Sequence, residues 1–222
     1  MPINEMKTYT KQELDEHTIC SFGYGSVIYG TVTSMSDVDV VVIVDDSLDF
    51  SEYVNSIYEI KENNNGIEFD TQYINESHFI EMVKNHNILA LESLWLPENT
   101  MELSKYKYHK YFTLDKWKLR QSISEVASNA WSKCHKKLTV EKDYDFYRGL
   151  KSLLHSLRVI IFGIQIAKYG KIVDYSEANY IWRDLWENDI CPSHKWEDYK
   201  SKYQPVMNAL RSEFVKLCPK PV

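Results

Sequence analysis

One stretch of the chain decides the fold: it reads Phe22-Gly23-Tyr24-Gly25-Ser26-Val27-Ile28-Tyr29-Gly30-Thr31 and, after a short spacer, Ser36-Asp37-Val38-Asp39-Val40-Val41-Val42-Ile43-Val44. A turn of small residues precedes two carboxylates, one residue apart, at the head of an apolar strand. Alternate residues of a strand point to the same side. We therefore expect Asp37 and Asp39 to project together, with Val38 turned the other way.

This pairing of acids with a small-residue turn predicts a chemistry. Two carboxylates held side by side repel each other unless a cation lies between them. Oxygen ligands of this kind favour Mg²⁺, the usual partner of nucleoside triphosphates. The turn at Gly25-Ser26 can offer backbone N–H groups and a hydroxyl to a phosphate. The stretch is therefore interpreted as a site for moving a nucleotidyl group.

Composition indicates an ordinary globular protein. The chain has 222 residues, 44% hydrophobic and 26% charged, enough for one large domain or two small ones. Its four cysteines (Cys20, Cys134, Cys191 and Cys218) form no C-x-x-C pair, so reduced cysteines are expected rather than a zinc site or disulfide framework.

The sequence predicts no membrane partner. The N-terminus is polar and lacks the apolar core of a signal peptide. The longest apolar runs, 38–44 and 159–167, are shorter than the roughly 20 residues that cross a bilayer. We expect a cytoplasmic protein, in the host cytoplasm if the gene is of phage origin, as a Tyr-, Asn- and Lys-rich composition suggests.

Charge is divided unevenly along the chain. The net charge of −6 argues against tight non-specific binding of nucleic acid. Residues 1–114 carry 7 Lys, no Arg and 19 Asp plus Glu, which gives −12, whereas residues 115–222 carry 19 Lys plus Arg and 13 Asp plus Glu, which gives +6. This charge division has two interpretations. The acidic half could bind metal while the basic half binds phosphate, or the opposite charges could help the two halves to dock.

The hydrophobic pattern predicts an α+β protein, with a small mixed-sheet half over residues 1–100 and an all-helical half over 113–218. Strands are expected at 18–22, 37–44 and 67–74, and residues 26–31 form a turn or one to two helical turns. The continuous Val/Ile run of 37–44 places that strand centrally. Helices are expected at 5–17, 50–62, 76–85, 88–96, 115–137, 142–169, 175–187 and 196–217.

Asp70 is the candidate third carboxylate. It lies on the polar side of the alternating strand 67–74, which follows the Asp37/Asp39 strand after one expected helix. Three converging carboxylates can hold two Mg²⁺ ions, one activating the attacking hydroxyl and one supporting the departing pyrophosphate. Asp70 could also help to deprotonate the nucleophile. The alternative is that Asp70 is only a solvated acid on the strand surface. If the register of the strand is shifted, Glu68 takes the place of Asp70 as the third carboxylate.

These motifs resemble a known superfamily. Gly25-Ser26, then ten residues, then Asp37-Val38-Asp39-Val40 is similar to the signature of the DNA polymerase β-like nucleotidyltransferases. The fuller string, with Tyr29-Gly30-Thr31 and Ser36, resembles the branch of small predicted nucleotidyltransferases of bacteria and bacteriophages. Two helical segments resemble the same branch, Asn87-Ile88-Leu89-Ala90-Leu91-Glu92-Ser93-Leu94 and Lys151-x-x-x-His155-x-x-Arg158.

The resemblance implies a catalytic domain over 1–100 with Mg²⁺ or Mn²⁺ at Asp37, Asp39 and Asp70, and a helical substrate-binding domain over 113–218. It also implies that a nucleoside triphosphate, with ATP expected, contacts Gly25, Ser26, Tyr29 and Ser36. The position after Ser26, often basic in relatives, is Val27 here, so a cationic contact must come from elsewhere.

A later helix offers such cations. Lys151, His155 and Arg158 are spaced to share one helical face, which could contact phosphate. Packing is an equal alternative for His155, and salt bridges to the acidic half are the alternative for Lys151 and Arg158.

The expected function is transfer of NMP from an NTP to a hydroxyl of an RNA end, a protein or a small molecule, with release of pyrophosphate. A catalytically silent nucleotide- or RNA-binding module of the same fold is the alternative. A protein-modifying, antitoxin-like role is a third, disfavoured by the length of the helical half.

Overall fold

The computed structural model describes residues 7–33, 36–96, 108–188 and 195–221. The chain divides into two compact units. Met1–Lys84 and Ala90–Phe112 form one, which we call the sheet unit, and Asn85–Leu89 and Thr113–Val222 form the other, the helical unit. Each is described by itself below, and the protein as a whole belongs to the α+β class.

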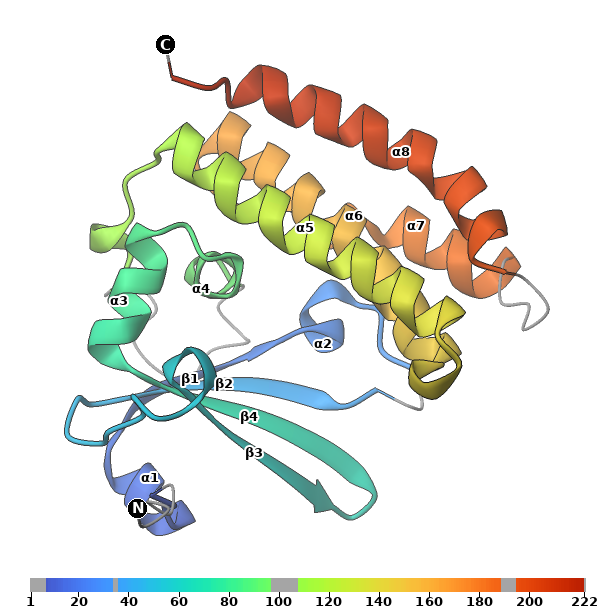
Figure 1. Ribbon diagram of the computed structural model, residues 1–222. Coiled ribbons are helices and arrows are strands. Elements are labelled where there is room, and N and C mark those ends of the chain that lie inside the picture. Colours follow the sequence, from blue (N-terminus) through green and yellow to red (C-terminus); the bar gives the residue numbers. More distant parts are fainter. Residues whose placement is uncertain (1–6, 34–35, 97–107, 189–194, 222) are drawn as a thin grey trace, which may run out of the picture. The chain divides into compact units, whose positions relative to one another are not determined.

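The sheet unit is built on four strands in the order β1-β2-β4-β3 (Figure 1). They are β1 (Thr18–Tyr24), β2 (Val38–Val44), β3 (Ile57–Asn64) and β4 (Ile67–Asn75). β1 pairs antiparallel with β2, β2 parallel with β4, and β3 antiparallel with β4. The Val/Ile run of β2 is therefore central, as its sequence predicts.

From Val41 to Val44, both faces of β2 are buried, because apolar side chains cover this part of the sheet on each side. On one face Val42 and Val44 join a cluster with Tyr9, Leu14, Leu48, Phe50 and Tyr73. On the other face Val41 and Ile43 are fully buried, and Phe22 meets the Phe79 ring of α3 (Glu76–Lys84) at 5.7 Å. Asp39 of β2 and Asp70 of β4, which pair with each other, lie on this second face, because Asp39 is two residues before Val41.

The expected helix over 50–62 is wrong. The segment instead forms a 3₁₀ turn (Val54–Ser56) followed by β3. Tyr58 and Ile60 pack on the apolar cluster while Glu59 and Lys61 point to the opposite face, which is strand periodicity. A two-residue turn at Asn65 and Gly66, both with positive φ, joins β3 directly to β4.

Short helices complete the sheet unit. The helix predicted from residue 5 is shorter than expected: α1 (Lys11–Glu16) begins after Thr10, which forms a capping box with Glu13. α2 (Ser26–Tyr29) follows β1 and contacts β1 and β2. α4 (Ile88–Leu94) crosses the division between the units, and a 3₁₀ turn covers His109–Tyr111.

The helical unit packs around one buried helix. It contains α5 (Lys116–Thr139), a 3₁₀ turn (Glu141–Asp143), α6 (Phe146–Tyr169), α7 (Asn179–Arg183), a π-helical turn (Asp184–Asn188) and α8 (Trp196–Leu217). α6 contacts both α5 and α8, and a Cβ on Gly163 would meet Ile123 and Phe214 at 3.0 Å. α6 alone among the described helices has the length and apolar composition of a membrane span, and most of it is buried inside this unit.

Candidate active site

A row of four polar side chains crosses the sheet. Tyr24 of β1 pairs with Asp39 of β2, Asp39 pairs with Asp70 of β4, and Asp70 pairs with Lys61 of β3. Directly paired residues place their side chains on the same face of a sheet. We call Tyr24, Asp39, Asp70 and Lys61 the acidic row. Strand register thus brings together two of the three predicted acids.

The turn before α2 is fitted to Asp39. Gly25 has a φ of +74°, and a Cβ built on it would overlap the Oδ2 atom of Asp39. Only a glycine permits both the left-handed backbone and this close approach. Ser26 follows, and its Oγ is buried and has no hydrogen-bond partner in the described part of the chain. The residue next to the glycine that packs on Asp39 therefore carries a buried hydroxyl.

The Asp70 side chain is largely shielded from solvent, and its two carboxylate oxygens have different surroundings. Its side chain is 18% exposed, and its Oδ1 is buried without a hydrogen-bond partner among the residues that the structure describes. Its Oδ2 accepts a hydrogen bond from the Lys61 ammonium. Glu68, the alternative third acid, pairs with Asn63 instead of lying in register with Asp39. The register therefore favours Asp70 over Glu68.

The charges of the acids act on two neighbouring side chains of the row, Tyr24 and Lys61. Burial is the main cause that raises the pKa of the Tyr24 hydroxyl, and the charges of Asp39, Asp70, Glu59 and Asp37 raise it further. The hydrogen bond to Asp70 is the main cause that raises the pKa of Lys61. Tyr24 therefore stays protonated and Lys61 stays charged at neutral pH.

The site has the donors for a divalent cation but not a closed cage. The paired carboxylates of Asp39 and Asp70 supply the oxygen ligands that a hard cation such as Mg²⁺ prefers. Within the described residues, however, no group of three or more His, Cys, Asp or Glu side chains is arranged to hold a metal ion. Lys61 holds the other oxygen of Asp70. The donor chemistry fits, and Asp39 and Asp70 are the residues that would hold the ion; Asp37 directly precedes β2, two residues before Asp39.

Two predicted nucleotide contacts have structural partners. The Tyr29 ring is buried and its hydroxyl donates to buried Glu92. The Ser36 Oγ accepts from the Thr33 N–H at 2.9 Å, while the Ser36 N–H donates to the Thr33 carbonyl at 3.0 Å. Both side chains shape the segments around the acids, and direct contact with a nucleotide remains a prediction for each.

The predicted cations of α6 lie in the helical unit. Arg158 is buried, and the Lys151 Nζ lies 5.6 Å from the centre of the Tyr147 ring. Burial, with the positive charges of Arg158 and Lys133, lowers the pKa of His155 to about 4. His155 is therefore a neutral imidazole at neutral pH. Phosphate contact by Lys151, His155 and Arg158 remains a prediction.

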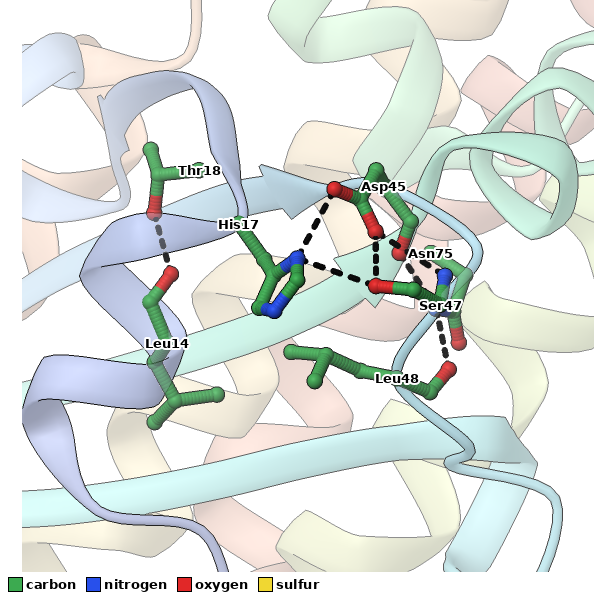
Figure 2. A network of polar contacts seen from close by, with 7 residues as sticks. All are labelled: Leu14, His17, Thr18, Asp45, Ser47, Leu48 and Asn75. Carbon is green, nitrogen blue, oxygen red and sulfur yellow. Dashed lines mark hydrogen bonds and ion pairs between the residues drawn. The ribbon is translucent and has the colours of Figure 1, made fainter.

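A Ser-His-Asp group lies at the other end of β2 (Figure 2). The His17 Nδ1 lies 2.9 Å from both the Asp45 Oδ2 and the Ser47 Oγ, and that Oγ donates to the Asp45 Oδ1. In a hydrolytic triad the serine contacts the other ring nitrogen, Nε2. This group therefore does not activate its serine. It ties the start of β1 to the turn after β2, which Asn75 also holds by hydrogen bonds to the Asp45 and Leu48 carbonyls.

Two members of the acidic row were missed by the sequence analysis. Tyr24 and Lys61 carry no recognisable motif, and Lys61 was hidden because its segment was predicted to be helical. A signal did exist for Lys61. The Asn65-Gly66 turn is typical of a two-residue hairpin, and such a turn fixes which residues of β3 and β4 face each other.

The mixed sheet carries a Gly-Ser turn packed on one aspartate, beside a second aspartate in register, and this arrangement suits transfer of a nucleotidyl group. Sequence comparison agrees: a family model described as nucleotidyltransferase domain matches residues 4–190, and the chain belongs to this family. Among solved structures, a nucleotidyltransferase-like protein from Exiguobacterium sibiricum 255-15 is 12% identical, with a TM-score of 0.34, over 93% of this chain and 74% of that one. The comparison with curated proteins finds no match.

Proposed function

We propose that this protein transfers NMP from a nucleoside triphosphate, with ATP as the expected donor, to a hydroxyl group and releases pyrophosphate. The observation that carries the proposal is the placement of the Asp39 carboxylate, in register with Asp70 and packed against the backbone of Gly25. Membership of the nucleotidyltransferase family supports the reaction class.

The residues of the sheet unit have distinct roles in this proposal. The Ser26 hydroxyl and the backbone of the Gly25 turn bind the phosphate chain, because the turn packs against Asp39 and the hydroxyl has no hydrogen-bond partner among the described residues. Asp37, Asp39 and Asp70 would hold Mg²⁺ or Mn²⁺, and the ion would neutralise phosphate charge and favour ionisation of the attacking hydroxyl.

The transfer step makes one bond and breaks one. The acceptor oxygen bonds to the α-phosphorus while the bond from that phosphorus to the bridging oxygen breaks, and the electron pair leaves with pyrophosphate. Asp70 would accept the hydroxyl proton on its Oδ1, for which the described residues provide no hydrogen-bond partner. RNA ends, protein side chains and small-molecule hydroxyls all meet the chemical requirement for an acceptor.

We also propose a cytoplasmic location. The three described cysteines (Cys20, Cys134 and Cys218) are buried and form no disulfide bond among the described residues, which suits a reducing compartment.

Label transfer tests the reaction. The full chain is incubated with each α-³²P-labelled NTP, a divalent cation and a cell extract, and the RNA, protein and small-molecule fractions are separated. We expect label in one fraction with the wild type, and a loss of at least about 100-fold with Asp37→Asn or Asp39→Asn.

The matched control is Asp15→Asn. Asp15 is an exposed acid of α1, 4.0 Å from Lys11, so the same chemical change there should leave transfer intact. Undiminished transfer by a folded Asp37→Asn/Asp39→Asn double variant would contradict the mechanism. Nucleotide binding without any transfer would favour the silent binding module instead.

A further inference from the structure

Cations are scarce in the sheet unit. Residues 1–114 contain seven lysines and no arginine. Among the five described lysines of this unit, four interact away from the acidic row: Lys11 with Asp15, Lys84 with Glu81, and Lys7 and Lys110 with the rings of Tyr9 and Tyr111. Lys61 is the described lysine that reaches the acids.

Register places Lys61 in the row. It pairs with Asp70 across β3 and β4, and its Nζ donates to the Asp70 Oδ2. The charges of Glu59 and Asp37 also act on this ammonium. Lys61 therefore neutralises part of a cluster of like charges that would otherwise repel one another.

The two members of the Lys61–Asp70 ion pair differ in exposure to solvent. The Lys61 side chain is 71% exposed, whereas that of Asp70 is 18% exposed. A solvated lysine on a flexible stem can leave its partner at little cost, because an ion pair of which one member is exposed contributes little to stability. The carboxylate cannot leave in the same way, since β4 is paired on both sides.

We propose that Lys61 is a resident counter-cation: it positions Asp70 while no metal is bound and yields the Asp70 Oδ2 to a divalent cation. The ammonium and the divalent cation then compete for the same oxygen, and no proton is gained or lost. The inference rests on the proposed function, because it takes Asp70 as a metal ligand. It makes Lys61 a positioning residue rather than a catalytic one.

Metal binding without nucleotide tests this directly. The dissociation constant of Mn²⁺ for the full chain is measured from the free-ion signal in electron paramagnetic resonance. We expect Lys61→Met to bind Mn²⁺ about threefold to tenfold more tightly than the wild type, because a positive charge beside the cation has been removed.

Four further variants define the cause. Lys84→Met removes a lysine that pairs with Glu81 at 2.6 Å on α3, and it should bind Mn²⁺ like the wild type. Lys61→Arg keeps a charge at the row and should also stay close to the wild type. Asp70→Asn/Lys61→Met should bind Mn²⁺ no more tightly than the wild type, since the carboxylate for which the two cations compete is gone. Lys61→Gln repeats the test without an apolar side chain on β3.

Thermal unfolding gives a second readout. Lys61→Met and Lys61→Gln should melt below the wild type in chelator and gain more from added Mn²⁺. Equal or weaker Mn²⁺ binding by both variants would overturn the inference and leave the proposed reaction standing. No Mn²⁺ binding by any variant would overturn the inference together with the metal dependence of the reaction.

Discussion

Gly25 shows at the scale of one residue how the backbone shapes the site. Its left-handed φ of +74° turns the chain from β1 into α2, and the absence of a side chain leaves room for the Asp39 carboxylate. A Cβ would force that carboxylate away from its place opposite Asp70. The turn and the acid are therefore one structural unit, although they stand fourteen positions apart in the sequence.

We expect Gly25→Ala to reduce nucleotidyl transfer by about 100-fold or more, because displacement of a catalytic group by about 1 Å can have that effect. Gly170→Ala is the matched control. Gly170 has a φ of +73° and no atom within 4 Å of its added Cβ, so both variants carry the same backbone strain, of order 1 kcal/mol. Initial rates are compared after both proteins are shown to be folded; equal rates would contradict the role of Gly25.

Asp45 predicts a dependence of stability on pH. Hydrogen bonds from Ser47 and His17 lower the pKa of the Asp45 carboxyl from 3.8 to about 2. Because the folded pKa lies below the unfolded one, this stabilisation is present above about pH 4 and is lost as the pH falls towards 2.

Acid unfolding followed by circular dichroism measures the Asp45 effect. Ser47→Ala should unfold at a higher pH than the wild type, because it removes the largest cause of the lowered pKa. Thr139→Ala gives the comparison, since the Thr139 hydroxyl is exposed and donates at 2.7 Å to a backbone carbonyl, that of His135. Coincident acid transitions for Ser47→Ala and the wild type would contradict the assignment.

At the scale of elements, α2 is held by a buried polar contact. The Tyr29 hydroxyl donates to Glu92 of α4, and both side chains are less than a tenth exposed. A buried carboxylate that loses a hydrogen-bond donor is expensive. The contact therefore fixes the short helix that carries Ser26 against a neighbouring element.

Tyr29→Phe should lower the free energy of unfolding by about 1 to 3 kcal/mol, because it takes a donor from a buried charge. Urea unfolding measures the change. In a double-mutant cycle with Glu92→Gln, the two losses should be strongly non-additive, since they remove one shared contact. Strict additivity would show that the two side chains are not coupled.

The elements differ in how far their sequences predict them. β2 and β4 are predicted within about one residue, because a continuous apolar run and a strict alternation are strong local signals. The acids on them follow from the same alternation. β3 was missed because its outward face (Glu59, Lys61 and Asn63) is polar, and its inward face is recognisable only once β4 is known as its partner.

Lys61 and Tyr24 could not be assigned for the same physical reason. Their place in the site depends on pairing between strands, which couples positions far apart in the chain. The Asn65-Gly66 turn would have supplied half of that information, since it sets the register of β3 on β4. The order β1-β2-β4 involves longer connections and had no comparable local signal.

At the scale of the whole molecule, charge and hydrophobicity separate along the chain. Residues 1–114 are strongly acidic, which suits a site for divalent cations, and residues 115–222 are basic, which suits contacts to phosphate. α6 shows why apolar length alone misleads at this scale. Its 24 residues include a long apolar run, yet the helix is the buried centre of the helical unit.

The most direct test of the central claim compares two labels on one nucleotide. The full chain is given [α-³²P]ATP or [γ-³²P]ATP with Mg²⁺ and the acceptor fraction found by label transfer. The account predicts that the α-label becomes attached to the acceptor, that the γ-label leaves as pyrophosphate, and that Asp39→Asn abolishes both events. Attachment of the γ-label, or α-label transfer undiminished in Asp39→Asn, would contradict it.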